Sequence, residues 1–216
     1  MKAYRGIGME GFIAKWYTAN SRKRLDDYKI LARRVATELP PGSRILEIAP
    51  GPGYFAIELA KLGSFEITGV DISRTFIEIA RRNAAEAGVA VDFQEGNAAA
   101  LPFSAGSFDF LVCSAAFKNF TAPVRALEEM HRVLKTGGSG LIADLRRDAP
   151  REAVHEAVDG MGLGLVNRVL TRLAFRFMLL KRAYRRHDFE SMLAETSFRA
   201  AEIKDDGIGL EVSLRK

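Results

Sequence analysis

The chain has 216 residues, of which 48% are apolar, and this is enough for one domain with a buried core. Its single cysteine, Cys113, excludes a disulfide framework and a four-cysteine zinc site, and we expect no bound metal. No segment reaches the roughly 18 uncharged apolar residues of a membrane-spanning helix, and residues 1–17 have no apolar stretch of signal-peptide length. These features predict a soluble cytoplasmic protein.

Positive charge is concentrated in two segments, although the net charge is only +5. Residues 1–34 contain nine lysines and arginines against three acidic residues, and residues 146–186 contain ten against four. The rest of the chain is acidic overall. These two basic segments are therefore candidates for contact with an anionic molecule or surface.

Strands and helices alternate in the apolar pattern between residues 43 and 145. Strands are expected at 43–49, 65–73, 89–97, 106–116 and 137–145. Helices are expected between them at 54–63, 74–88 and 122–135. Strands that alternate with helices of this length predict an α/β fold with right-handed βαβ units and a doubly wound, mostly parallel sheet.

The pattern changes after Pro150. The next residues, up to 186, are predicted to form a helical insertion that is interrupted by glycines at 160–164. A further helix is expected at 187–198, followed by two strands around the turn Asp205-Asp206-Gly207. Such a turn is typical of a hairpin and predicts an antiparallel C-terminal edge strand, which completes a seven-stranded sheet.

A glycine turn follows the first strand. The run from Gly51 to Ala56 fits the Gly-x-Gly-x-x-Ala pattern, in which the backbone approaches a nucleotide cofactor closely. Glu47 stands inside the strand, where dinucleotide-binding turns carry an apolar residue, and a buried acid needs hydrogen-bond donors or a cation. The chain also offers only one βαβαβ half with such a turn. These features disfavour a nicotinamide dehydrogenase.

Four segments, in order and at ordinary spacing, resemble the class I S-adenosylmethionine-dependent methyltransferases. They are ILEIAPGPG, GVDIS, FQEGNAAALPFSAGSFDFLVCS and LEEMHRVLKTGGSGLIAD. The resemblance covers roughly residues 43–145 and the terminal strands, and it implies a Rossmann-like methyltransferase with S-adenosylmethionine as its cofactor. The whole chain, 1–216, would be a single domain. Its parts would be an N-terminal helical arm (1–42), a cofactor-binding core (43–149), a helical lid (150–186) and a closing helix with strands (187–216).

The same resemblance implies a set of cofactor contacts. Asp71 would accept hydrogen bonds from both ribose hydroxyls, and Asn97, in place of the family's usual aspartate, would accept one from the adenine amino group. Ala49 replaces the first glycine of the family's loop. The alternative for Asp71 is a helix cap, and the alternative for Tyr17, which would cover the methionine end, is ordinary packing. The full set is Tyr17, Glu47, Ala49, Pro50, Gly51, Gly53, Asp71, Ile72, Gly96, Asn97, Ala98 and Ser114.

The acceptor site is less well defined by the sequence. Lys118 and Asn119 follow the fourth strand, at the rim where open α/β sheets bind ligands. They are candidates for acceptor contact, as is His155 in the insertion, and a solvated loop is the alternative for the first two. We assign no catalytic base, because the sulfonium leaving group is already activated and positioning can supply most of the acceleration. Cys113 is expected to be a core residue.

The insertion contains Arg168, Arg172 and Arg176, which recur every four residues and predict one helical stripe. The insertion can be a substrate lid, a homodimer face or a helix at an anionic membrane surface, or its arginines can simply be solvated. In methyltransferases of this kind the N-terminal arm and the insertion close over the acceptor. We therefore expect a small-molecule acceptor that is partly apolar and anionic.

Other functions stay open on the sequence alone. A non-catalytic regulatory protein would need the same cofactor-binding residues. Methylation at an anionic membrane surface or of nucleic acid is a further alternative. No aromatic–basic motif of an RNA-binding module is visible, so nucleic acid is not the expected partner.

Overall fold

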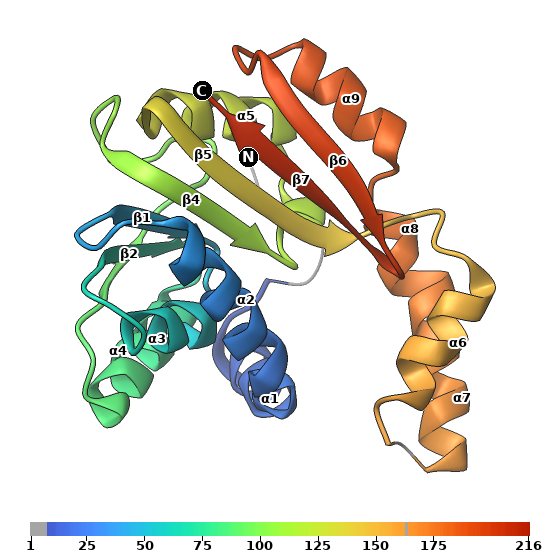
Figure 1. Ribbon diagram of the computed structural model, residues 1–216. Coiled ribbons are helices and arrows are strands. Elements are labelled where there is room, and N and C mark those ends of the chain that lie inside the picture. Colours follow the sequence, from blue (N-terminus) through green and yellow to red (C-terminus); the bar gives the residue numbers. More distant parts are fainter. Residues whose placement is uncertain (1–7, 163) are drawn as a thin grey trace.

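The computed structural model describes residues 8–162 and 164–216. One seven-stranded sheet runs through the molecule in the order β3-β2-β1-β4-β5-β7-β6 (Figure 1). Its strands are β1 (Arg44–Ile48), β2 (Glu66–Asp71), β3 (Asp92–Glu95), β4 (Phe108–Ser114), β5 (Leu134–Leu145), β6 (Ala200–Asp206) and β7 (Gly209–Arg215).

Strands β1 to β5 pair in parallel, and β7 pairs antiparallel with both β5 and β6. The predicted mostly parallel, doubly wound sheet is confirmed. The antiparallel strand β7 lies one place in from the edge, and its hairpin partner β6 forms the edge itself. The strand order reverses between β1 and β4, and the carboxyl ends of these two strands are where such sheets bind ligands.

Helices cover both faces of the sheet. They are α1 (Gly11–Ser21), α2 (Leu25–Glu38), α3 (Tyr54–Ala60), α4 (Arg74–Ala87), α5 (Pro123–Val133), α6 (Arg151–Asp159), α7 (Leu165–Ala174), α8 (Leu180–Arg182) and α9 (Arg186–Ala194). Short turns of 3₁₀-helix lie at η1 (Arg22–Arg24) and η2 (Phe117–Asn119), and η3 (Phe175–Leu179) is π-helical. Local chemistry sets several boundaries: the Ser73 hydroxyl caps α4, Gly88 ends it in the left-handed conformation, and Pro123 opens α5.

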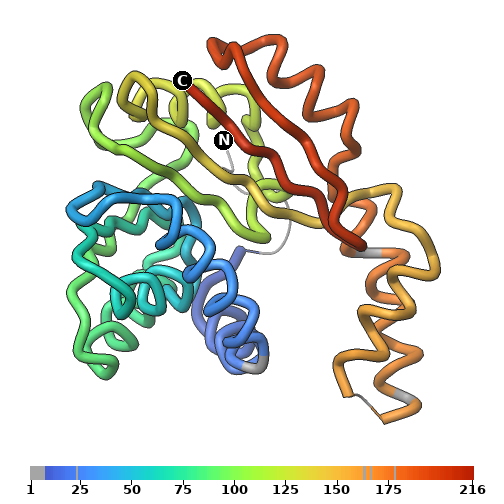
Figure 2. Tube along the Cα trace, viewed as in Figure 1, coloured from blue at the N-terminus to red at the C-terminus, as the bar shows by residue number. Residues whose placement is uncertain are grey.

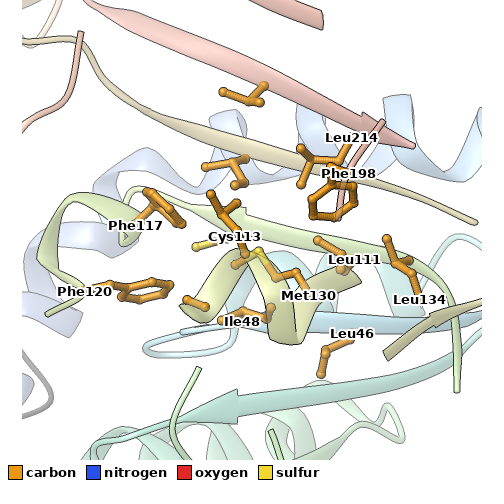
Figure 3. Close-up of a cluster of buried hydrophobic side chains, with 14 of the residues drawn as sticks. Leu46, Ile48, Leu111, Cys113, Phe117, Phe120, Met130, Leu134, Phe198 and Leu214 are labelled. Atoms are coloured by element: carbon orange, nitrogen blue, oxygen red, sulfur yellow. The ribbon is translucent and has the colours of Figure 1, made fainter. Parts of the chain in front are cut away.

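Alternate residues of the central strands face opposite sides of the sheet. Ile45 and Phe110 belong to a buried cluster with α2, α3 and α4. Leu46, Leu111 and Cys113 belong to a second cluster with α5 and α9, part of which is drawn in Figure 3. Cys113 is therefore the core residue that the sequence predicts, and burial raises the pKa of its thiol well above the usual value. Because both faces are buried, these strands read as continuous apolar runs.

The insertion forms a separate helical layer. Helices α6 and α7 project away from the sheet, and the chain runs out and back so that the two ends of the insertion meet (Figures 1 and 2). At that point the amide of Arg147 donates to the carbonyl oxygen of Tyr184 at 3.1 Å. Val154, Val158, Phe175 and Leu180 form a small apolar cluster inside the insertion. Among the described residues, no helix is long and apolar enough to cross a bilayer.

Candidate functional site

The glycine turn lies at the carboxyl end of β1, beside the reversal of strand order. Ala49 has a φ of 58°, Gly51 one of 54° and Gly53 one of 78°, all in the left-handed region that favours glycine. A Cβ on Gly53 would lie 2.6 Å from the Phe93 ring, so this glycine is required by packing as well as by its backbone angle. Ala49 adopts this left-handed conformation without being a glycine, at some cost in strain.

Glu47 points from β1 toward the start of α3 and is 3% exposed. Its carboxylate accepts a hydrogen bond from the amide of Ala56 at 3.2 Å, within the first turn of that helix. Burial raises the pKa of Glu47 to about 8, and this hydrogen bond opposes the rise. The strand thus places a buried acid below the turn, where a nearby cation would favour its ionised form.

Asp71 ends β2 and ties the glycine turn to the neighbouring strand. One carboxylate oxygen accepts from the Gly51 amide at 3.0 Å, and the other accepts from the Ser73 amide at 2.9 Å. Burial raises the pKa of Asp71 to about 6, against the effect of these hydrogen bonds. Each carboxylate oxygen has a further lone pair, so Asp71 can hold the turn and still accept two hydroxyl donors. The cap of α4 is supplied by Ser73 instead.

The loop after β3 lies next to Asp71. The Gly96 amide donates to the Asp71 carbonyl oxygen at 2.9 Å, and a Cβ on Gly96 would lie 2.8 Å from Val70. The Asn97 side-chain oxygen accepts from the Ala99 amide at 2.9 Å, which leaves one lone pair for a ligand. Ile72 is 41% exposed and offers an apolar surface beside this loop. Pro50 is buried and Ala98 half-buried.

Tyr17 reaches the glycine turn from the N-terminal arm. A Cβ built on Gly51 would lie 4.0 Å from its ring, and the ring packs edge-on against Phe76 with centroids 5.7 Å apart. The arm is held there by further contacts: the Ser73 hydroxyl donates to the Met9 carbonyl oxygen, and the Thr75 hydroxyl donates to Glu10. The arm therefore lies over the carboxyl end of β2.

A buried ion pair occupies the carboxyl ends of β4 and β5. The Lys118 ammonium lies 2.6 Å from the Asp144 carboxylate and also donates to the Ala115 carbonyl oxygen at 2.6 Å. Asp144 accepts from the Lys118 amide as well. The solvated-loop alternative is wrong for Lys118, which is only 8% exposed, and Asn119 is half-buried.

Asp144 is the residue of this region that sequence reasoning missed. An acid inside the apolar run LIADL gives the same signal that singled out Glu47 in LEIA. The neighbouring strand β4 is followed by a strained residue: Ala115, directly after Ser114, has a φ of 57°. Two left-handed alanines, Ala49 and Ala115, therefore follow the adjacent strands β1 and β4.

The insertion turns two of its arginines toward an acidic residue of its own. Asp159 on α6 lies 2.7 Å from the Arg172 guanidinium and 3.4 Å from that of Arg168. These two arginines share one side of α7, as the predicted stripe requires, and that side is turned toward α6. His155 is half-buried on α6, within the insertion, whereas Lys118 and Asn119 lie on η2 after β4.

The residues at the carboxyl ends of β1, β2 and β3 fit S-adenosylmethionine. The cofactor carries positive charge on its ammonium and sulfonium groups, and Glu47 is a buried acid for which the described residues include no ion-pairing cation. Its ribose offers two hydroxyl donors, which match the free lone pairs of Asp71. Its adenine can lie on the exposed Ile72 beside Asn97.

Comparison with known proteins gives one matching family model. Residues 45–138 match the model of the methyltransferase domain. The demethylmenaquinone methyltransferase of Deinococcus radiodurans is 40% identical over 96 residues, which are 44% of this chain and 40% of that protein. That of Thermus thermophilus is 40% identical over 105 residues, 48% of this chain and 47% of that one. These matches thus span less than half the length of either relative.

A longer but weaker match extends into the insertion. The ubiquinone/menaquinone biosynthesis C-methyltransferase UbiE of Coxiella burnetii is 29% identical over 176 residues, 78% of this chain and 69% of that protein.

Solved structures share the fold. A Methanococcus maripaludis protein assigned to the S-adenosylmethionine-dependent methyltransferases superposes with a TM-score of 0.82 at 21% identity, over 98% of this chain and 95% of that one. A methyltransferase of the same kind from Aquifex aeolicus gives a TM-score of 0.66 at 16% identity, over 88% and 97%.

Proposed function

We propose that the chain, whose residues 45–138 match the model of the methyltransferase domain, is an S-adenosylmethionine-dependent methyltransferase that methylates a ring carbon of an ionised, apolar-tailed hydroquinone. The observation that carries the proposal is the placement of two buried carboxyl groups, Glu47 and Asp71, at one glycine turn. Both contact the backbone of this turn or of the helix after it, so they can bind a cationic nucleoside without further rearrangement.

Each residue of the turn then has a definite part in binding. Gly51 lets the methionine portion approach the backbone, while Asp71 accepts the ribose hydroxyls and keeps the turn in place. Tyr17 covers the methionine end from above. Glu47, below the turn, becomes ionised when a cation binds nearby, because the cation offsets the cost of burying its charge.

The acceptor class is supported by the relatives and by charge. Two proteins that are 40% identical to this chain over 96 and 105 residues are named demethylmenaquinone methyltransferases, and a third is named a ubiquinone/menaquinone biosynthesis C-methyltransferase. An ionised hydroquinone is an anionic ring with an apolar tail, and it therefore matches the acceptor expected from the two basic segments.

Bound S-adenosylmethionine supplies a methyl group on a sulfonium, and the electron pair of the broken S–C bond stays on the sulfur. The protein has to hold the acceptor carbon in line with that bond, and positioning of this kind accounts for a large part of such accelerations. The Lys118–Asp144 ion pair holds the carboxyl ends of β4 and β5 in place, and these ends would line one side of the acceptor site. The proton displaced from the ring carbon passes to water.

The test is single-turnover transfer. The full chain is incubated with methyl-labelled S-adenosylmethionine and a short-tailed demethylmenaquinone reduced to its quinol, and the products are analysed by mass spectrometry. We expect the label on the ring carbon, and less than one-tenth of that yield with Asp71→Asn at the same cofactor concentration. Cofactor binding without transfer to any quinol would contradict the acceptor assignment and favour a non-catalytic role.

A further inference from the structure

The outer face of the insertion is apolar. Leu165, Val169, Leu173 and Phe177 recur every four residues from α7 into η3, and between 46% and 74% of each is exposed. Leu170 on the same side is 57% exposed. Large apolar side chains that recur at this spacing form one continuous surface along a helix.

The inner face of the same helix carries its charge. Arg168 and Arg172 point to Asp159 on α6, and Phe175 is buried against the apolar cluster of the insertion. The usual surface helix keeps its apolar stripe inside and its charged residues outside. Here the outer face is apolar over several turns, which indicates that something other than water covers it.

A second apolar surface lies on α1. Phe12 is 82% exposed and Trp16 59%, while Ala14 and Tyr17 on the opposite side pack toward Phe76. Figure 1 shows α1 and the α6–α7 pair on the side of the sheet toward which β4 and β5 point. Monomeric proteins rarely expose large contiguous apolar patches, and such patches mark binding surfaces.

Both apolar surfaces lie within the two basic segments. Residues 1–34 and 146–186 each have an excess of six positive charges. Arg176 and Lys181 lie over the Phe177 ring at 5.3 and 5.8 Å, so exposed cations border the apolar face directly. An apolar face bordered by lysine and arginine is the pattern of a helix that lies in the headgroup region of an anionic bilayer.

We infer that the protein docks on an anionic membrane surface through the outer face of α7 and η3 together with Phe12 and Trp16 of α1. The helix from α7 to α8 continues over residues 165–182 and is about 27 Å long at about 1.5 Å per residue. It lies in the interface plane. A second copy of the chain would bring one basic segment against another, whereas anionic lipid neutralises them and attracts each exposed cation.

Docking in this way sets the side of the sheet that receives the acceptor against the bilayer. The inference stands on the exposed faces and their charge and does not require the proposed hydroquinone. An apolar-tailed acceptor would then reach the enzyme from the lipid.

Vesicle flotation tests the insertion. The variant Leu165→Gln/Leu173→Gln/Phe177→Gln removes the apolar face, and the control Ile30→Gln/Leu62→Gln removes exposed apolar side chains of α2 and of the turn after α3. We expect wild type and control to bind phosphatidylglycerol-containing vesicles equally and the triple variant at least about tenfold more weakly. Pure phosphatidylcholine vesicles should bind all three poorly. Calorimetry with S-adenosylmethionine verifies that each variant keeps its cofactor site.

The single tryptophan of the chain tests the α1 surface. We expect the emission of Trp16 to shift to shorter wavelength, and its quenching by acrylamide to fall, when anionic vesicles are added. An unshifted emission on bound protein would overturn the assignment of α1.

Two results would overturn the inference as a whole. One is equal vesicle binding by the triple variant and wild type. The other is a lipid-free dimer of the wild type that the triple variant converts to a monomer, because a second copy would then cover the face. Neither result bears on methyl transfer to a short-tailed quinol in solution, so failure here and failure of the proposed function are distinguishable.

Discussion

At the residue scale, Asp71 holds the glycine turn in place and is the proposed acceptor of the ribose hydroxyls. Its oxygens accept hydrogen bonds from the amides of Gly51 and Ser73, and each oxygen keeps a further lone pair for a ligand. Asp71→Asn replaces one acceptor by a donor beside a buried amide. We expect it to weaken S-adenosylmethionine binding about 10- to 100-fold and to lower the free energy of unfolding by about 1–3 kcal/mol.

Calorimetry and urea unfolding measure the two effects separately. Glu66→Gln is the matched control, because Glu66 lies at the other end of β2 and is exposed. Unchanged affinity in Asp71→Asn would leave this carboxylate with a structural role alone.

Glu47 makes the stability of the cofactor-free protein depend on pH. Its pKa is about 8 in the folded protein against an ordinary value of 4.5, so between these two pH values the folded state keeps a proton that the unfolded state releases. The stability that protonated Glu47 contributes is therefore fully present below about pH 4.5. It is lost as the pH rises to about 8, and the free energy of unfolding falls by an amount on the order of a few kcal/mol. Urea unfolding at pH 5 and pH 8 should show a smaller loss for Glu47→Gln than for wild type. Equal losses would mean that Glu47 is not the group responsible.

Ala49 tests the strain in the glycine turn. A left-handed alanine costs about 1–2 kcal/mol, and a glycine at this position removes that strain. The greater freedom of glycine in the unfolded chain offsets about 0.4–1 kcal/mol of the gain. We expect Ala49→Gly to raise the free energy of unfolding by up to about 1 kcal/mol. Ala85→Gly, at an exposed position of α4, should lower it by about 0.5–1 kcal/mol. Similar losses in both variants would show that the turn is unstrained.

At the scale of elements, the Lys118–Asp144 pair joins η2 to β5. Lys118→Met leaves a buried carboxylate without its cation, and we expect a loss of about 3–5 kcal/mol in the free energy of unfolding. Adding Asp144→Asn removes the unpaired carboxylate charge, and the double variant should regain much of the lost free energy of unfolding. Lys204→Met, which breaks an exposed pair with Glu202, should cost less than about 1 kcal/mol. A loss as small as this for Lys118→Met would contradict a buried ion pair.

Elements that depend on local signals were predictable, and those that depend on distant partners were not. The helix that ends at Gly88 and the hairpin around Asp205-Asp206-Gly207 follow from residues within a few positions. The strand expected at 137–145 begins at Leu134 instead, where Leu134 pairs with Phe108 before an irregular register leads to the next pair, Ser139 with Phe110.

The direction of the insertion's arginines also depended on a distant partner. Periodicity correctly predicts that Arg168 and Arg172 share one side of a helix. It does not say which side faces inward, since that depends on Asp159 in another helix. The burial of Lys118 could not be predicted for the same reason, because it depends on Asp144, which lies 26 positions away in the sequence.

At the scale of the whole molecule, the sheet order and the glycine turn place a cofactor site at the reversal between β1 and β4. The sequence predicts this much because the βαβ pattern and the turn are both local. The two basic segments are likewise visible in the sequence, but their outward apolar faces emerge only when α1 and α7 are packed against their neighbours.

Calorimetric titration of the full chain with S-adenosylmethionine, S-adenosylhomocysteine and NAD⁺ tests the central claim most directly. Glu47 and Asp71 at one turn predict micromolar binding of the first two, with NAD⁺ binding far more weakly because the turn serves a single nucleoside. Tighter binding of NAD⁺ than of S-adenosylmethionine would contradict the account.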